Sequence, residues 1–166
     1  RTALTQRMYA AIVGSESDLD PEPLQSVSWR TIATLPESRP PSTIEELGAT
    51  VGGADAPRIG TILHAYWRSW TARTRRAEPL EISALHLNNI AQLHLPGEPF
   101  LEYQLQAQSL RPETPVITFG YGDGGPWYIP TADELPHGGY ETTVAFSTAS
   151  IDDQMRGVIK RLLTPE

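Results

Sequence analysis

The sequence contains no cysteine, which excludes disulfide bonds, thiolate nucleophiles and zinc sites built from thiolates. It also lacks a block of basic residues, and its net charge of -7 is the opposite of what nucleic-acid binding requires. No apolar run approaches the roughly 20 residues that a membrane-spanning helix needs. We therefore expect neither a nucleic-acid partner nor a transmembrane segment.

Two common catalytic motifs are missing as well. The sequence has no G-x-S-x-G element, and its serines at positions 15 and 17 fall in a polar turn without a neighbouring base. It has no H-E-x-x-H element for a helical zinc site. A complete Ser/His/Asp triad and a metalloprotease helix are therefore both disfavoured.

What is present is the pattern of one mixed α/β unit spanning residues 1–166, with 39% hydrophobic residues. Apolar periodicity and capping residues predict helices over Thr2–Val13, Ser42–Thr50, Asp55–Arg75, Glu98–Leu110 and Ser150–Leu163. Strands are expected over Leu24–Leu35, Leu80–Leu87, Ile90–Leu95, Val116–Tyr121 and Thr142–Phe146, with one helical turn over Thr131–Leu135. The expected fold is a β-hairpin and further strands in a mixed sheet that helices cover on both faces. Because the first residues already read as helix, we also expect the chain to be part of a longer polypeptide.

The four histidines do not form an obvious metal site. Asn88-Asn89 predicts a tight hairpin turn, and in that register His86 and His94 point to opposite faces of the sheet. They therefore do not share a metal ion. His64 has no second ligand one helical turn later, and His86 on an apolar face is typical of a core histidine.

A glycine-rich stretch follows the strand that ends at Tyr121. Gly120, Gly122 and Gly125 match the G-x-G-x-x-G spacing of dinucleotide-binding loops. That fingerprint requires the loop to open a helix, whereas Pro126-Trp127-Tyr128-Ile129-Pro130 favours an extended segment. A turn that lets backbone or aromatic side chains approach another strand is the better interpretation.

Glu98, in the stretch LHLPGEPF, has two interpretations. It could lie in the first turn of the following helix and stabilise the helix N-terminus. Alternatively, it could project from the end of a strand into a cleft at the carboxyl edge of the sheet, where sites in α/β folds are common. If the strands that end near Leu95 and Tyr121 are neighbours, Glu98 meets the glycine-rich loop.

The two segments LPGEPFLEYQL and GYGDGGPWYIPTADELPHGGYE together resemble the neutral/alkaline (non-lysosomal) ceramidase family, especially its bacterial ceramidase-like branch. The resemblance is strongest over residues 80–141 and concerns the C-terminal part of the family's catalytic domain. It implies a zinc-dependent amidohydrolase that cleaves the N-acyl amide bond of ceramide-like lipids.

The resemblance also implies roles for individual residues. Glu98 and Tyr128 would be two zinc ligands, and two histidines outside this chain would complete the site. Pro96 and Gly97 would set the turn that aims Glu98. Further candidates for lining the pocket or supporting the ligands are Gly97, Tyr121, Asp123, Trp127, His137 and Tyr140.

The implied partners are the N-terminal remainder of the same catalytic domain and a lipid-like amide substrate. By itself the chain would then be inactive, and the resemblance favours an exported protein. The alternative is a non-catalytic binding or scaffolding module that keeps the ceramidase-like fold without metal.

Overall fold

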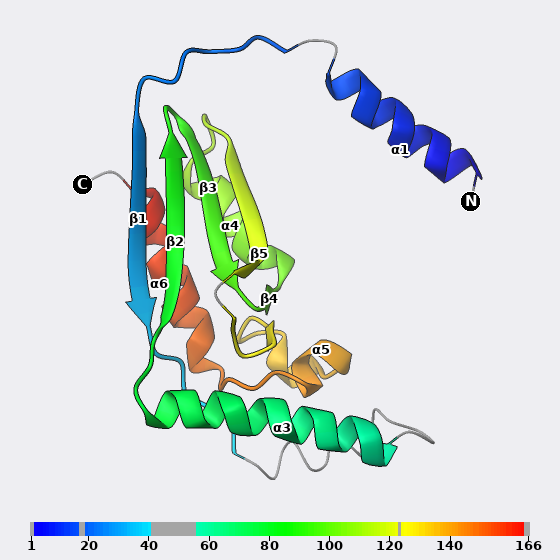
Figure 1. Ribbon diagram of the computed structural model, residues 1–166, viewed down its shortest axis with the longest axis vertical. Helices are drawn as coiled ribbons and strands as arrows, with labels where there is room; N and C mark the ends of the chain where they lie inside the picture. Colours follow the sequence, from blue (N-terminus) through cyan, green and yellow to red (C-terminus); the bar gives the residue numbers. More distant parts are fainter. Residues whose placement is uncertain (1, 17–18, 41–55, 123, 165–166) are drawn as a thin grey trace.

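The computed structural model describes residues 2–16, 19–40, 56–122 and 124–164. Figure 1 shows a sheet with helices behind it and one long helix across its lower end. The longer helices are α1 (Thr2–Ser15), α3 (Ala56–Arg75), α4 (Leu101–Leu110) and α6 (Ser150–Leu163). The short ones are η2 (Leu135–His137) and α5 (Tyr140–Thr143). The described helices include none long and apolar enough to cross a membrane. The expected mixed α/β class is confirmed.

The main sheet has four strands in the order β1-β2-β3-β5. These are β1 (Val27–Thr34), β2 (Leu80–Leu87), β3 (Ile90–Pro96) and β5 (Val116–Gly122). The first two pairings are antiparallel, and β3 and β5 run parallel. A second, two-stranded parallel sheet pairs β4 (Glu98–Pro99) with β6 (Tyr128–Ile129). The carboxyl ends of β3 and β5 therefore lead side by side into the segments that form this small sheet.

The predicted hairpin and its register are confirmed. His86 lies opposite Ala91 and Ser83 lies opposite His94, so the two histidines are on different faces of the sheet. Asn88 adopts the left-handed conformation at the turn, with φ 51°. Its side chain accepts hydrogen bonds from the backbone N–H groups of residues 25 and 26 and donates one to the carbonyl oxygen of Pro23. Asn88 thereby links the hairpin turn to residues 23–26, which precede β1.

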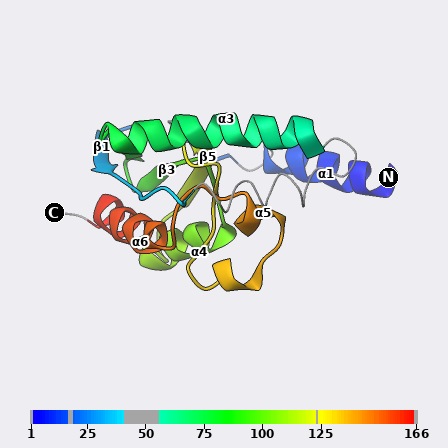
Figure 2. The ribbon, with the colours of Figure 1, turned by 90° about the horizontal axis from the view of Figure 1, so that it is seen from below.

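One face of the sheet carries the main hydrophobic core, under α4 and α6. Ile82, Ala84, Leu93 and Leu95 are fully buried on this face. Seen from below in Figure 2, α4 and α6 lie together on one side of the strands, and α3 lies on the other. The amphipathic pattern of residues 150–163 predicted α6 correctly, because its apolar stripe packs into this core.

The opposite face was expected to be covered too, but the described residues leave it partly open. Trp29 is 59% exposed, and Ile117 and Phe119 are each 45% exposed. His94 stacks between the rings of Trp29 and Phe119. In Figure 1, α3 crosses only the end of the sheet. The described residues therefore leave the rings of Trp29 and Phe119 exposed.

A second hydrophobic cluster lies at the lower end of the sheet, where α3 packs. Its buried members are Leu63, Trp67, Trp70, Leu80, Val144 and Phe146. They join α3 to the start of β2 and to the segment before α6. Trp127 and Tyr128 are half-buried against this cluster. The second core therefore anchors the residues that follow the glycine-rich loop.

Three sequence predictions need correction. The helix expected from Glu98 begins at Leu101, because Pro99 favours extended backbone in the preceding residue and Glu98 pairs with β6. The expected strand over Thr142–Phe146 is instead α5 followed by irregular backbone. The helical turn expected over Thr131–Leu135 forms as turns and then a 3-10 helix that ends at His137. The helix expected over Ser42–Thr50 lies outside the described residues.

Candidate functional site

Glu98 and Tyr128 are direct neighbours in the small parallel sheet. The register pairs their Cα positions, and it pairs Pro99 with Ile129 in the same way. The Glu98 N–H donates to the carbonyl oxygen of Trp127 at 2.8 Å, and the next ladder bond joins Phe100 to Ile129 at 3.1 Å. Residues 30 positions apart in the sequence thus present a carboxylate and a phenol at the same point. Glu98 is therefore not a residue of the α4 helix.

Two glycines make this approach of the two segments feasible. Gly97 has φ 57°, and a Cβ atom added there would collide with the carbonyl oxygen of Trp127. Gly125 has φ 156°, and a Cβ atom added there would lie 2.6 Å from the Gly97 nitrogen. Real side chains do not tolerate such contacts with backbone atoms. The glycine-rich loop therefore serves close packing of backbone against the P-G-E turn, as the sequence interpretation favoured over nucleotide binding.

Strained backbone flanks the same loop on both sides. Tyr121 has φ 62° and Trp127 has φ 68°, conformations that bulky L-residues rarely adopt. The Tyr121 N–H donates to the Gly97 carbonyl oxygen at 2.6 Å, which fixes this unusual geometry. Residues held in such conformations are concentrated at functional sites, where surrounding structure compensates their energetic cost.

The carboxylate of Glu98 interacts with two phenols. Burial, followed by the negative charge of Glu98, raises the pKa of Tyr128 to about 12. A hydrogen bond with Glu98 is the main reason that the pKa of Tyr121 is also raised. Tyr121 is 75% exposed, whereas Tyr128 is half-buried and its ring contacts that of Tyr140. Glu98 thus lies between one solvent-facing and one partly enclosed tyrosine.

Both Glu98 and Tyr128 line a cavity of about 690 Å³ between α3 and the glycine-rich loop. This size is in the usual range for a small-molecule site, about 300–1,000 Å³. Aromatic rings form much of its wall, with Trp127 contacting both Tyr66 and Phe146. The predicted pocket residues Gly97, Tyr121, Trp127 and Tyr140 line it as well.

Structure comparison finds similarity to solved ceramidases. One is described as a ceramidase complexed with C2, and another is the neutral ceramidase from Pseudomonas aeruginosa. Each aligns with 51% of this chain at 15% identity and a TM-score of 0.46. This chain spans only 14% and 15% of the length of those two chains. No protein-family model matches the sequence, and no curated protein does. The chemistry of the site therefore has to be judged from its own residues.

The donor set suits part of a zinc site. A carboxylate and a phenol beside each other supply two oxygen ligands, which is half of a four-coordinate shell. Across residues 2–16, 19–40, 56–122 and 124–164, no group of three or more His, Asp or Glu side chains could hold a metal ion. A zinc ion at this point would therefore need ligands beyond Glu98 and Tyr128 from outside the described residues.

The four histidines all lie away from the cavity wall. His86 contacts the Leu162 carbonyl oxygen at 3.1 Å on the core face, and burial lowers its pKa. His94 belongs to the aromatic row on the open face, and His64 packs on Trp67. His137 pairs with Glu134 instead of reaching the site. Asp123, the remaining candidate, lies outside the described residues.

Sequence reasoning missed the contribution of α3 to this site. Tyr66, Ser69, Trp70 and Arg73 line the cavity from that helix, and Arg76 lines it from the turn that follows. The apolar periodicity of residues 55–75 predicted the helix, but it did not predict which side chains would line a cavity. Their proximity to Glu98 follows from how α3 packs across the end of the sheet, which no local pattern encodes.

Proposed function

We propose that this chain forms part of the catalytic centre of a zinc-dependent amidohydrolase resembling the neutral/alkaline ceramidases. The observation that carries the proposal is the pairing of Glu98 with Tyr128 at the edge of an aromatic-walled cavity. In the sequence resemblance these two residues are the metal ligands that this part of the domain contributes. The other two ligands would be histidines outside this chain.

The reaction is hydrolysis of an N-acyl amide. Water adds to the carbonyl carbon, the carbon–nitrogen bond breaks, and the nitrogen takes a proton, so that a fatty acid and an amine are released. When bound, zinc would polarise the carbonyl group and favour ionisation of the attacking water. Glu98 and Tyr128 would fix the position of the metal, because the backbone ladder holds their Cα atoms in register.

Tyr121 would orient Glu98. Its hydroxyl lies close enough to the carboxylate proposed to bind the metal that Glu98 raises the pKa of Tyr121. Partners of this kind fix the direction of a metal-ligating group and increase metal affinity. The aromatic wall formed by Tyr66, Trp127 and Phe146 would receive the apolar part of the substrate and exclude water around it.

The decisive experiment measures zinc in the complete polypeptide after dialysis against a zinc-buffered solution. Wild type is expected to hold one zinc ion per chain, and Glu98→Ala should lower zinc affinity by about tenfold or more. Glu102→Ala is the matched control, since Glu102 is an exposed carboxylate in the first turn of α4. Release of fatty acid from a short-chain N-acyl sphingosine should fall in parallel with zinc.

The same measurement separates the enzyme from a non-catalytic module. Zinc content that is unchanged in Glu98→Ala, or absent from the wild-type protein, would contradict the proposed ligand role. The chain would then be a binding or scaffolding module that has this fold without the metal chemistry.

A further inference from the structure

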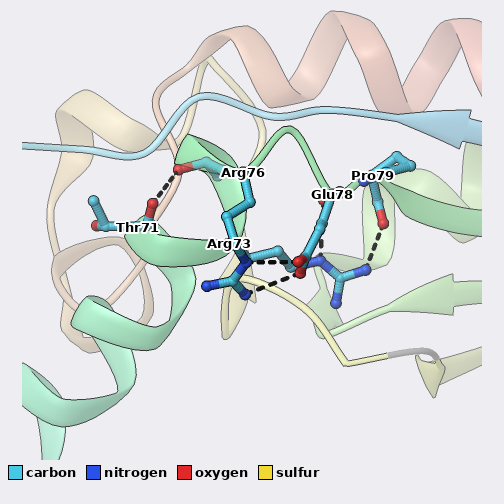
Figure 3. A network of polar contacts seen from close by, with 6 residues as sticks. Thr71, Arg73, Arg76, Glu78 and Pro79 are labelled. Atoms are coloured by element: carbon cyan, nitrogen blue, oxygen red, sulfur yellow. Dashed lines mark hydrogen bonds and ion pairs between the residues drawn. The ribbon is translucent and has the colours of Figure 1, made fainter.

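The cavity beside Glu98 has an arginine whose charge the proposed reaction does not use. Arg73 lines the wall from α3, among the aromatic rings described above. Its Nε donates to the Glu78 carbonyl oxygen at 3.2 Å, and its Nη2 donates to the Pro79 carbonyl oxygen (Figure 3). Two backbone contacts therefore fix the plane of the guanidinium group.

The third nitrogen of Arg73 faces the glycine-rich loop. Nη1 is the nearest heavy atom to a Cβ built on Gly124, at 3.9 Å, and Gly124 also lines the cavity. No described residue accepts a hydrogen bond from Nη1. The guanidinium thus offers a pre-oriented donor edge between α3 and the loop.

Arg76 lines the same cavity but differs from Arg73, because it forms a salt bridge with Glu78. Its Nε and Nη2 bind the two carboxylate oxygens of Glu78 at 2.6 and 3.0 Å (Figure 3). Arg73 donates hydrogen bonds only to carbonyl oxygens of this turn, although its charge contributes, after the hydrogen bond from Arg76, to the lowered pKa of Glu78. Of the two arginines, Arg73 is therefore the one with hydrogen-bonding capacity left for an anionic group of an occupant.

A second donor of the wall is also unpaired. Trp70 is 5% exposed, and its indole N–H has no hydrogen-bond partner among the described residues. That nitrogen is itself buried, so an occupant of the cavity would meet the ring of Trp70 and not its N–H group. Trp70 and Arg73 lie on the same helix, three residues apart.

We propose that this cavity selects amides whose amine portion carries a carboxylate, that is, N-acyl amino acids, with Arg73 Nη1 as the anchor of that carboxylate. The proposal rests on the amidohydrolase function and gives it a substrate class other than the ceramides, whose amine portion has no carboxylate. The apolar acyl part would lie on the rings of Trp127 and Phe146. A single guanidinium edge suits a monoanion, whereas phosphate sites gather several donors. The Glu98 carboxylate on the same wall further disfavours a dianion.

The test is a binding measurement that does not depend on turnover. The complete polypeptide, stripped of metal with EDTA, is titrated by calorimetry with N-lauroylglycine and with N-lauroylethanolamine, its neutral counterpart of nearly the same length. Wild type should bind the glycine conjugate at least tenfold more tightly. Arg73→Gln should abolish this preference while it leaves affinity for the neutral probe unchanged, which also shows that the variant is folded.

Two further variants sharpen the result. Arg75→Gln removes the same charge from the same helix end, but Arg75 does not line this cavity, so the preference should persist. Arg73→Lys keeps the charge without the fixed donor edge and should retain only part of the preference. Equal affinity of wild type for the two probes, or an unchanged preference in Arg73→Gln, would overturn the proposal.

Fatty-acid release by the zinc-loaded protein separates this proposal from the function on which it rests. Selective binding without release of lauric acid would support the anchor and refute the amidohydrolase. Release from both probes with equal kcat/KM, without selective binding, would support the amidohydrolase and refute the anchor.

Discussion

A tyrosine lies beside a carboxylate both in the core and at the cavity, and the surroundings of these two pairs differ. In the core, Asp152 is 7% exposed and accepts hydrogen bonds from the Ala132 N–H at 3.0 Å and from Arg156 Nε at 2.8 Å. The neighbouring Tyr103 is fully buried and donates to the Pro130 carbonyl oxygen at 3.0 Å. Burial, followed by the charge of Asp152, raises the pKa of Tyr103. Asp152 and Tyr103 thus find their partners within the protein.

The pair at the cavity also joins a carboxylate to a phenol, but the described residues give it no cation. Glu98 interacts with Tyr128 and Tyr121, and none of the described basic side chains forms an ion pair with it. Backbone contacts, and not a salt bridge, hold the two segments together. The protein thus matches the charge of Asp152 with Arg156, whereas the described residues leave the charge of Glu98 without an ion pair.

The largest effect on stability should come from a substitution in the core pair, Asp152 and Tyr103. Asp152→Ala should lower the free energy of unfolding by about 2–3 kcal/mol, because the Ala132 N–H and the Arg156 guanidinium lose their acceptor. Urea denaturation at pH 7 measures this, and zinc content should not change. The exposed neighbour Asp153 is the control, and Asp153→Ala should cost no more than about 1 kcal/mol. A loss of zinc from Asp152→Ala comparable to that from Glu98→Ala would remove the distinction between the pairs.

An intermediate effect on stability is expected when the backbone contacts beside the cavity pair, Glu98 and Tyr128, are disturbed. Gly97→Ala should destabilise the protein by about 1–3 kcal/mol, since the residue has φ 57° and its Cβ would strike the Trp127 carbonyl oxygen. Gly157→Ala is the contrast, because nothing lies near that Cβ on α6 and the change should stabilise the helix by about 0.5–1 kcal/mol. Thermal unfolding of both variants gives the comparison. If the two substitutions change the unfolding temperature equally, the close approach of the backbone at Gly97 is not needed to hold the two segments of the site together.

The smallest effect is electrostatic and concerns Tyr128. In metal-free protein its phenol should titrate near pH 12 in tyrosine-labelled NMR spectra, with Tyr128→Phe identifying the resonance. Glu98→Gln should lower this pKa, because the negative charge that disfavours the phenolate is removed. Burial should still keep it above the ordinary value of 10.0. Zinc added to the wild-type protein should also lower it, since a bound cation favours the phenolate. A pKa that neither change affects would separate Tyr128 from both Glu98 and the metal.

Local patterns in the sequence predicted much of this fold. The Asn88-Asn89 turn gave the correct hairpin register because alternating burial leaves little freedom to slip by one residue. The apolar stripe of residues 150–163 predicted the bounds of α6. Prediction was poorer where tertiary contacts outweigh local preference. Pro99 disfavours helical backbone at Glu98, but no pattern within residues 98–110 indicates that Tyr128 pairs with Glu98.

For the candidate site, the sequence identified Glu98, Tyr128 and the glycine-rich loop, and the structure places these on one cavity. It did not identify Arg73 or Trp70, because a helix stripe looks the same whether it faces a core or a cavity. The zinc ion, its two further ligands and the substrate remain predictions for the experiments above.

Asn88 has a consequence for the kinetics of folding. Its side chain binds the backbone of Gln25, 63 residues earlier in the sequence, whereas the hairpin around it is local. Closing so long a loop is entropically costly, so this contact should form after the folding barrier has been crossed. A substitution that removes the Asn88 side-chain contacts should therefore accelerate unfolding and leave the folding rate nearly unchanged. The order in which β1 joins the hairpin is thus open to measurement at a single side chain.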